Sequence, residues 1–173
     1  MTEVLPPAPL WRRLLAAVYD SLLLLGIWVV ALLADVLVRD ALGAARNWTA
    51  LRAYLFGIGL IFFAWFWTHG GQTLGMRAWR LRTQRGDGRA LSWSSAAVRY
   101  AVMLCAWGIV LAPAFARLPR LRDEPHAGPA AIACAALAAA GLLGMLLDPR
   151  RRTPQDWLSG TLTIVLPKSS QGR

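Results

Sequence analysis

Five ionisable residues lie in or beside long apolar runs, where a charge is costly to hold. Asp20 stands inside the first run, Arg13 lies at its start, and Arg99 lies near the start of the third run. Asp148 and Asp156 follow the last run. A charge at the centre of a membrane helix costs about 2.5–3.5 kcal/mol on insertion scales. We therefore expect a charge network among these residues, which either locks the helices together or lines a path for an ion.

The spacing along the first run restricts how these charges pair. Seven residues separate Arg13 from Asp20, so both share one helix face but lie about 10.5 Å apart along the axis. Because helical side chains lean toward the N-terminus, a direct bridge between them is not expected. Arg99 is the predicted partner of Asp20, while Asp148 or Asp156 is the predicted partner of Arg13. A protonated Asp20 resting in a helix interface is the alternative.

The elements that position these charges are four apolar runs of about 20 residues, the length that crosses a hydrocarbon core of about 30 Å. They cover residues 14–34, 50–68, 96–116 and 129–147. The chain of 173 residues is 57% hydrophobic and only 16% charged, against about 25% charged residues in soluble domains. The sequence thus predicts an all-α membrane protein, a four-helix transmembrane bundle in a single domain.

The positive charges predict the orientation of this bundle. Thirteen Lys and Arg residues lie in or next to the two terminal segments and the segment between the second and third runs, against six on the other side. Positive residues are enriched on the cytoplasmic side, so both termini are expected there. The net charge of +10 is spread between apolar runs rather than along one polar face, which argues against nucleic-acid binding.

The segment between the second and third runs predicts a small β element on the cytoplasmic side. Residues 78–84 alternate apolar and polar and precede Gly-Asp-Gly at 86–88, so we expect a hairpin over residues 76–93. The β-branched segment 161–166 could add a strand to it. The alternative is an amphipathic helix over residues 73–83. Two further expectations are that Gln72 and Thr73 cap the inner mouth of the bundle, and that the tail 168–173 is disordered.

The combination resembles the RDD family of bacterial membrane proteins, named for one arginine and two aspartates. The stretch WRRLLAAVYDSLLL is similar to the family's first motif through Arg13 and Asp20. The stretch that begins GQTLG and ends at Arg99 is similar to its second, and DPRRRTPQDWLSGTLTIV to its closing motif, with Asp156 as the second aspartate. Pro154-Gln155 stands where the family commonly has a His beside this Asp. The resemblance implies an inner-membrane location and, more loosely, transport, since some relatives are linked to cation/proton antiport.

Two hypotheses for the function follow. In the first, an ion or small ligand crosses the membrane along the Arg/Asp network, and four helices per chain would then require a homo-oligomer. In the second, the charges are structural in a non-transporting assembly, regulatory or lipid-interacting module, and the Arg-rich hairpin contacts anionic headgroups. The sequence has no nucleophile arrangement, phosphate-binding loop or cofactor motif, so neither an enzyme nor a cofactor or metal is expected.

Overall fold

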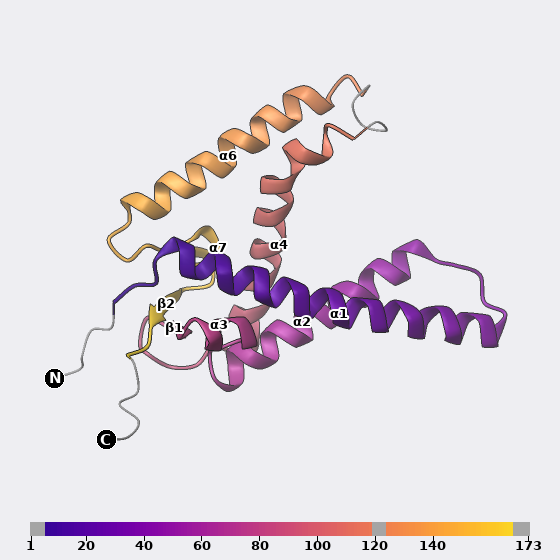
Figure 1. Cartoon of the computed structure of the whole chain (residues 1–173), viewed down its shortest axis with the longest axis horizontal. Helices are drawn as coiled ribbons and strands as arrows, with labels where there is room; N and C mark the ends of the chain where they lie inside the picture. The colour runs from indigo at the N-terminus through magenta and orange to yellow at the C-terminus, as the bar shows by residue number, and fades with distance from the viewer. Residues whose placement is uncertain (1–5, 119–123, 168–173) are drawn as a thin grey trace.

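Four long apolar helices dominate the computed structural model, which describes residues 6–118 and 124–167 (Figure 1). They are α1 (Leu10–Leu42), α2 (Trp48–His69), α4 (Trp93–Phe115) and α6 (Ala127–Leu147), and each is long and apolar enough to cross a membrane. Each predicted span coincides with one of them. The predicted fold class is confirmed, whereas the tail 168–173 lies outside the described residues.

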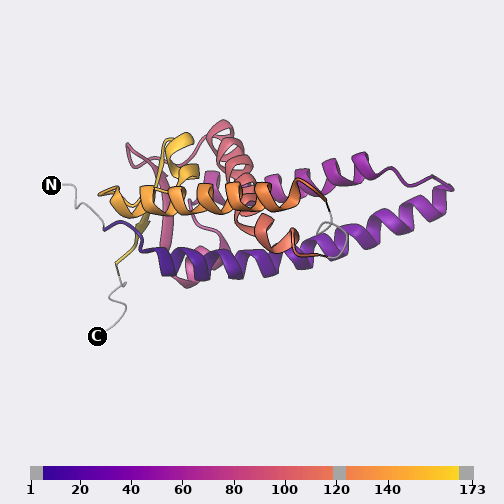
Figure 2. The ribbon, with the colours of Figure 1, turned by 90° about the horizontal axis from the view of Figure 1, so that it is seen from above.

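The four helices form two pairs. Figures 1 and 2 show α1 and α2 side by side, while α4 and α6 pack on each other as a second pair that extends in another direction. Helix α1 ends at Gly43, which adopts the left-handed conformation (φ 62°) that glycine tolerates without strain. Helix α2 begins at Asn47, whose side chain accepts hydrogen bonds from two backbone N–H groups of the first turn. Local sequence thus sets the tight connection in the first pair.

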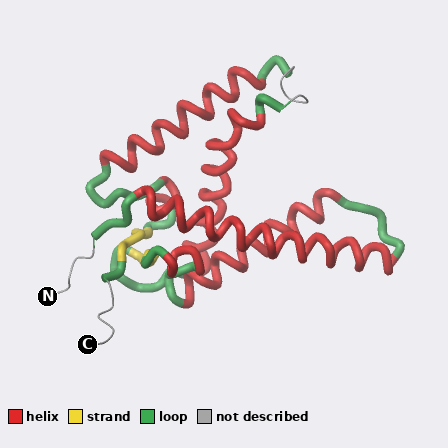
Figure 3. Tube along the Cα trace, in the orientation of Figure 1, coloured by secondary structure: helices red, strands yellow, loops and turns green. Residues whose placement is uncertain are grey.

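Four short elements gather where the two helix pairs meet, beside the N-terminal half of α1 (Figure 1). They are α3 (Leu74–Ala78), β1 (Leu81–Arg85), α7 (Pro154–Leu158) and β2 (Thr161–Val165), and we call them the platform. The two strands pair antiparallel, with Thr83 opposite Thr163 at the centre (Figure 3). On the other edge of β2, Ala8 donates a backbone hydrogen bond to the Thr163 carbonyl at 3.0 Å. The platform therefore joins both ends of the chain to the segment between α2 and α4.

The platform confirms one strand prediction and corrects another. The tail segment does form a strand, paired with β1 as predicted. The local hairpin over residues 76–93 is wrong: the Arg85 N–H donates to the Arg89 carbonyl to close a turn, and the chain then enters α4 at its N-cap Ser92. Residues 89–92 are too few to return along β1, whose partner is β2. Of the alternative helix over 73–83, only α3 is helical.

The core is small and aromatic. Phe63 stacks on Trp67 within α2 at 5.1 Å between ring centroids, and Tyr100 of α4 packs on Phe63 at 5.7 Å. Gly59 allows this approach, because the Tyr100 hydroxyl occupies the place where a Cβ would be. Most other Leu, Val and Ile side chains of the long helices are exposed, an arrangement that suits contact with lipid.

The contact between Gly59 and Tyr100 gives a stability test of the α2–α4 packing. A Cβ at Gly59 would overlap the Tyr100 hydroxyl, so Gly59→Ala should destabilise the protein by about 1–3 kcal/mol. Gly57→Ala is the matched control, because its Cβ would meet nothing within 4 Å and alanine favours the helix. Thermal unfolding in detergent measures both. Adding Tyr100→Phe should partly rescue Gly59→Ala, and equal stability of the two alanine variants would contradict the described packing.

Candidate functional site

The predicted charge network is divided into two buried clusters on the platform side of the molecule. One is built on Asp156, with Arg13 and Arg99 as its partners. The other is built on Asp20, whose partners come from the start of α3. Asp148 belongs to neither cluster. The structure therefore brings together three of the five predicted residues and places the other two elsewhere.

Asp156 is fully buried and receives both arginines. Arg13 Nη1 donates to Asp156 Oδ2 at 2.5 Å, and Arg99 Nη1 donates to Oδ1. Asp156 lies in the first turn of α7, where its Oδ2 also accepts hydrogen bonds from the backbone N–H and the hydroxyl of Thr153. Pro154 begins the helix with its backbone angle already suited to it. A carboxylate has about four acceptor positions, so those of Asp156 are fully used.

Each arginine is anchored by further contacts with the platform. Arg99 Nη1 donates to the Thr161 hydroxyl at 2.7 Å, and its guanidinium lies over the Trp67 ring, 5.2 Å from the centroid. Arg13 donates to the backbone carbonyls of Ala8 and Thr163, each at 3.2 Å. These neutral acceptors and the aromatic face stabilise the second positive charge that a single carboxylate leaves uncompensated.

The charges around Asp156 decide its protonation. Burial disfavours the ionised carboxyl, but the guanidiniums of Arg99 and Arg13, together with the Thr153 N–H, hold the pKa of Asp156 well below its usual range. The group is therefore ionised at neutral pH and acts as a permanent counter-ion. Because its acceptor positions are filled, Asp156 has none free for a ligand.

Asp20 lies in α1 with only 4% of its surface exposed, and its partners are neutral. The Thr73 hydroxyl donates to Asp20 Oδ2 at 2.5 Å, and the Gly75 N–H donates to Oδ1 at 2.8 Å. Thr73 is also the N-cap of α3, since its hydroxyl accepts from the Met76 N–H. Two donors occupy two of about four acceptor positions, so this carboxyl can still take a proton or a cation.

Glycine at position 75 is required for this contact. A Cβ there would overlap the Ala16 carbonyl of α1 and lie 2.9 Å from the Asp20 carboxyl group. Without a side chain, the backbone of α3 comes close enough to α1 for its N–H to reach the carboxylate. The GQTLG segment, residues 71–75, therefore leads into a short helix, α3, which begins at Leu74 and is seated on α1.

The predicted ion pair between Asp20 and Arg99 is wrong. The guanidinium of Arg99 is turned to Asp156 and the threonines of β2, whereas the carboxylate of Asp20 is turned to α3. For Asp20 and Arg99, the prediction considered only a contact between two long helices. The platform supplies nearer partners for both residues, and these partners satisfy them separately.

Three further residues of the predicted site are placed as follows. Asp148 accepts hydrogen bonds from the side chain and backbone N–H of Arg152, which hold its pKa below the usual range. Of the two partners predicted for Arg13, the structure pairs it with Asp156 and not with Asp148. Thr73 binds Asp20, as described above. Gln72 donates to the Leu81 carbonyl at 2.6 Å and fixes the start of β1 rather than capping a mouth.

The sequence reasoning missed the residues that complete the Asp156 cluster. Thr161 and Thr163 alternate along β2 and both face inward, where they meet Arg99. Thr153 supplies two donors to Asp156 from the start of α7. The period-2 placement of threonine in TLTIV was a usable signal, because hydroxyls on the buried face of a strand need polar partners.

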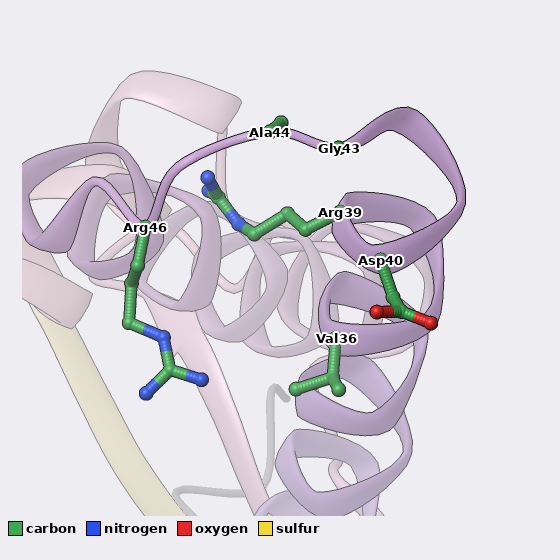
Figure 4. A pocket seen from close by; sticks show the side chains of 6 residues that line it. All are labelled: Val36, Arg39, Asp40, Gly43, Ala44 and Arg46. Atoms are coloured by element: carbon green, nitrogen blue, oxygen red, sulfur yellow. The ribbon is translucent and has the colours of Figure 1, made fainter.

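A pocket of about 310 Å³ lies at the opposite end of α1, where the chain turns into α2 (Figure 4). Arg39 lines this pocket, but its guanidinium already donates to both carboxylate oxygens of Asp35 and to the Ala45 carbonyl. Asp40 and Arg46 are exposed side chains on the same pocket. None of its charged side chains is buried, so it does not resemble the two clusters.

Removal of the Asp156 charge should be strongly destabilising. Asp156→Asn leaves two arginines without their buried counter-ion, a loss of about 3–5 kcal/mol for a broken buried pair. Asp87→Asn is the control, because Asp87 pairs with Arg89 at 3.9 Å on the exposed surface, where ion pairs contribute little. Unfolding of both variants in detergent measures the difference. Wild-type stability for Asp156→Asn would show that the cluster contributes nothing.

The lowered pKa of Asp156 also gives a pH dependence. Because the folded pKa lies below that of the unfolded chain, about 3.9, the stabilisation is complete above that value and is lost as pH falls below it. The unfolding temperature of wild type should therefore approach that of Asp156→Asn, which cannot titrate at this position, as pH falls from 7 to 3. A gap between the two that stays constant below about pH 4 would contradict the linkage.

Comparison with known families agrees with the sequence motifs. The model of the RDD family matches residues 7–160, which include all four long helices, α3, β1 and α7, and the charged residues of both clusters, and end just before β2. Neither curated proteins nor solved structures gave a match. The match covers most of the chain and runs from the first motif into the closing one. The chain therefore belongs to the RDD family and is a membrane protein.

Proposed function

We propose that this protein transports an ion or a small ligand across the bacterial inner membrane, and that protonation of Asp20 is part of the transport step. The observation that carries the proposal is the environment of Asp20. It is a buried carboxyl in a membrane-spanning helix, held by the neutral donors Thr73 and Gly75. Ionisable residues in such helices commonly belong to ion and proton pathways.

Protonation of Asp20 would act on α3. An ionised Asp20 accepts one hydrogen bond on each oxygen. A protonated carboxyl carries no charge, so the hydrogen bonds from Thr73 and Gly75 would no longer be charge-assisted and would weaken. Because α3 is a five-residue helix whose N-terminus is held by these contacts, its position on α1 would then depend on the proton.

The Asp156 cluster would serve as the fixed frame for this movement. It joins α1 and α4 to α7 through ion pairs, and to β2 through hydrogen bonds to the Thr163 carbonyl and the Thr161 hydroxyl. A carboxylate held ionised between two arginines keeps the same contacts over the physiological pH range. Transport would then use one aspartate that changes state and one that does not.

The same proposal includes orientation and assembly. The excess of positive residues beside both termini supports a cytoplasmic platform. The long helices bury few of their side chains within one chain, which leaves apolar surface for lipid or for a second copy. We therefore propose a homo-oligomer as the working unit.

The second candidate is a non-transporting module of the inner membrane that assembles with or regulates a partner, or binds lipid. The Asp156 carboxylate favours it, because all of its acceptor positions are filled by protein donors, as expected of a structural charge. The exposed arginines around β1 favour it as well, since they could contact anionic headgroups. They are Arg77, Arg80, Arg85 and Arg89.

A flux assay in proteoliposomes distinguishes the two candidates. Wild-type protein should couple a proton gradient to movement of Na⁺, K⁺ or another small solute, read by a pH-sensitive dye inside the vesicles. Asp20→Asn should abolish that flux, since the amide cannot take up a proton, while its remaining carbonyl oxygen can still accept one hydrogen bond.

Asp40→Asn is the matched control, because Asp40 is an exposed aspartate on the same helix. It should retain wild-type flux. Monodisperse elution of both variants checks that they are folded. Absence of solute-linked proton movement in wild type would overturn the transport proposal and favour the module.

A further inference from the structure

A shallow apolar groove lies between the last two turns of α6 and the short helix α7. It encloses about 320 Å³ and is open on one side. It is lined by residues of α6, of α7 and of the turn between them: Gly141, Gly144, Met145, Arg152, Pro154, Trp157 and Leu158. None of these residues contacts Asp20 or forms part of the Asp156 cluster, so the function proposed above does not use the groove.

The two glycines shape the α6 wall. A Cβ at Gly144 would meet nothing within 4 Å, and one at Gly141 would meet only the Pro154 ring, at 3.6 Å. Opposite them, Trp157 and Leu158 are 60% and 68% exposed, so the rim from α7 is apolar as well. The groove can therefore accept a flexible hydrocarbon chain without displacing a side chain of the protein.

Positive charge gathers at the end of α6 beside this groove. Arg152 donates its backbone N–H and two guanidinium nitrogens to Asp148, and its guanidinium lies over the Trp157 ring at 4.7 Å. The same turn exposes Arg150 and Arg151, which form no ion pair within the described part of the chain. Three arginines thus face one carboxylate, and two positive charges remain uncompensated.

Along the membrane normal, the apolar groove is followed by the arginines, just as the acyl chains of a phospholipid are followed by its phosphate. Gly141 lies about 10 Å along the helix from Asp148, so the groove reaches into the hydrocarbon region while the arginines stand at the helix end. Exposed tryptophan such as Trp157 is typical of the membrane–water interface. Apolar surface below and positive charge above match an acyl chain and a phosphate.

We propose that this groove binds one anionic phospholipid, with an acyl chain between α6 and α7 and the phosphate beside Arg150 and Arg151. Charge complementarity selects this occupant. A second copy packed on the groove by two-fold symmetry would bring the same two arginines against each other. The chain's own tail carries Lys168 and Arg173, which the same charges repel.

Native mass spectrometry of the full-length protein in detergent tests the site, with phosphatidylglycerol and phosphatidylcholine of identical acyl chains as probes. Wild type should retain one phosphatidylglycerol more tightly than phosphatidylcholine, on the order of 30-fold for two arginines near an anionic group. Gly144→Leu should weaken both lipids by filling the groove. Its matched control is Gly128→Leu, an exposed glycine on the same helix with open space around it, which should bind like wild type.

The charge variant separates the two parts of the site. Arg150→Gln with Arg151→Gln should remove the preference for phosphatidylglycerol and leave phosphatidylcholine binding unchanged, whereas Arg77→Gln with Arg89→Gln on the platform should keep the preference. Equal retention of the two lipids by wild type, or wild-type lipid binding by Gly144→Leu, overturns the proposal. So does a wild-type dimer that Gly144→Leu abolishes, which would assign the groove to a second copy. None of these outcomes depends on flux through Asp20.

Discussion

The carboxylate of Asp156 is the contact on which the rest of the structure depends. It joins Arg13 at the start of α1 to Arg99 in the second turn of α4, although 143 and 57 residues separate them from it in sequence. A buried ion pair adds little net stability over well-packed apolar groups, but breaking it leaves an uncompensated charge. We infer that its main effect is on specificity, because the three charged groups bring α1, α4 and α7 to one place.

Asp20 lies in the same region but is bound in a different way. Asp156 has its acceptor positions filled by two arginines and Thr153, whereas Asp20 holds two neutral donors from α3. One carboxylate is therefore fixed in its charged form, and the other keeps acceptor positions free. The two aspartates of the sequence motifs thus differ in one respect: Asp156 has no acceptor position free, whereas Asp20, which the proposed function uses, has two.

The distribution of apolar and charged side chains on the surface suits a protein surrounded by lipid. The long helices share only a small aromatic core between α2 and α4, and most of their apolar side chains face outward toward lipid. Charge is concentrated at the helix ends and on the platform instead. The groove beside α6 joins both kinds of surface, since it has an apolar floor and an arginine-rich end. The phospholipid that we propose for this groove would cover apolar surface that one chain leaves open.

The sequence by itself determined the four spans, the membrane class and the strand after the last span. It also singled out the four charged residues that the structure buries or nearly buries: Arg13, Asp20, Arg99 and Asp156. These depend on run length, hydropathy and local alternation, which are properties of single segments. Tertiary structure alone decided the pairing. Helical periodicity gives the helix face and the depth of Asp20 and Arg99, but it does not show which element covers that face. In the structure, α3 contacts Asp20, and α7 and β2 contact Arg99, so neither residue contacts the other. A short segment can supply a buried partner that no pattern within a single helix reveals.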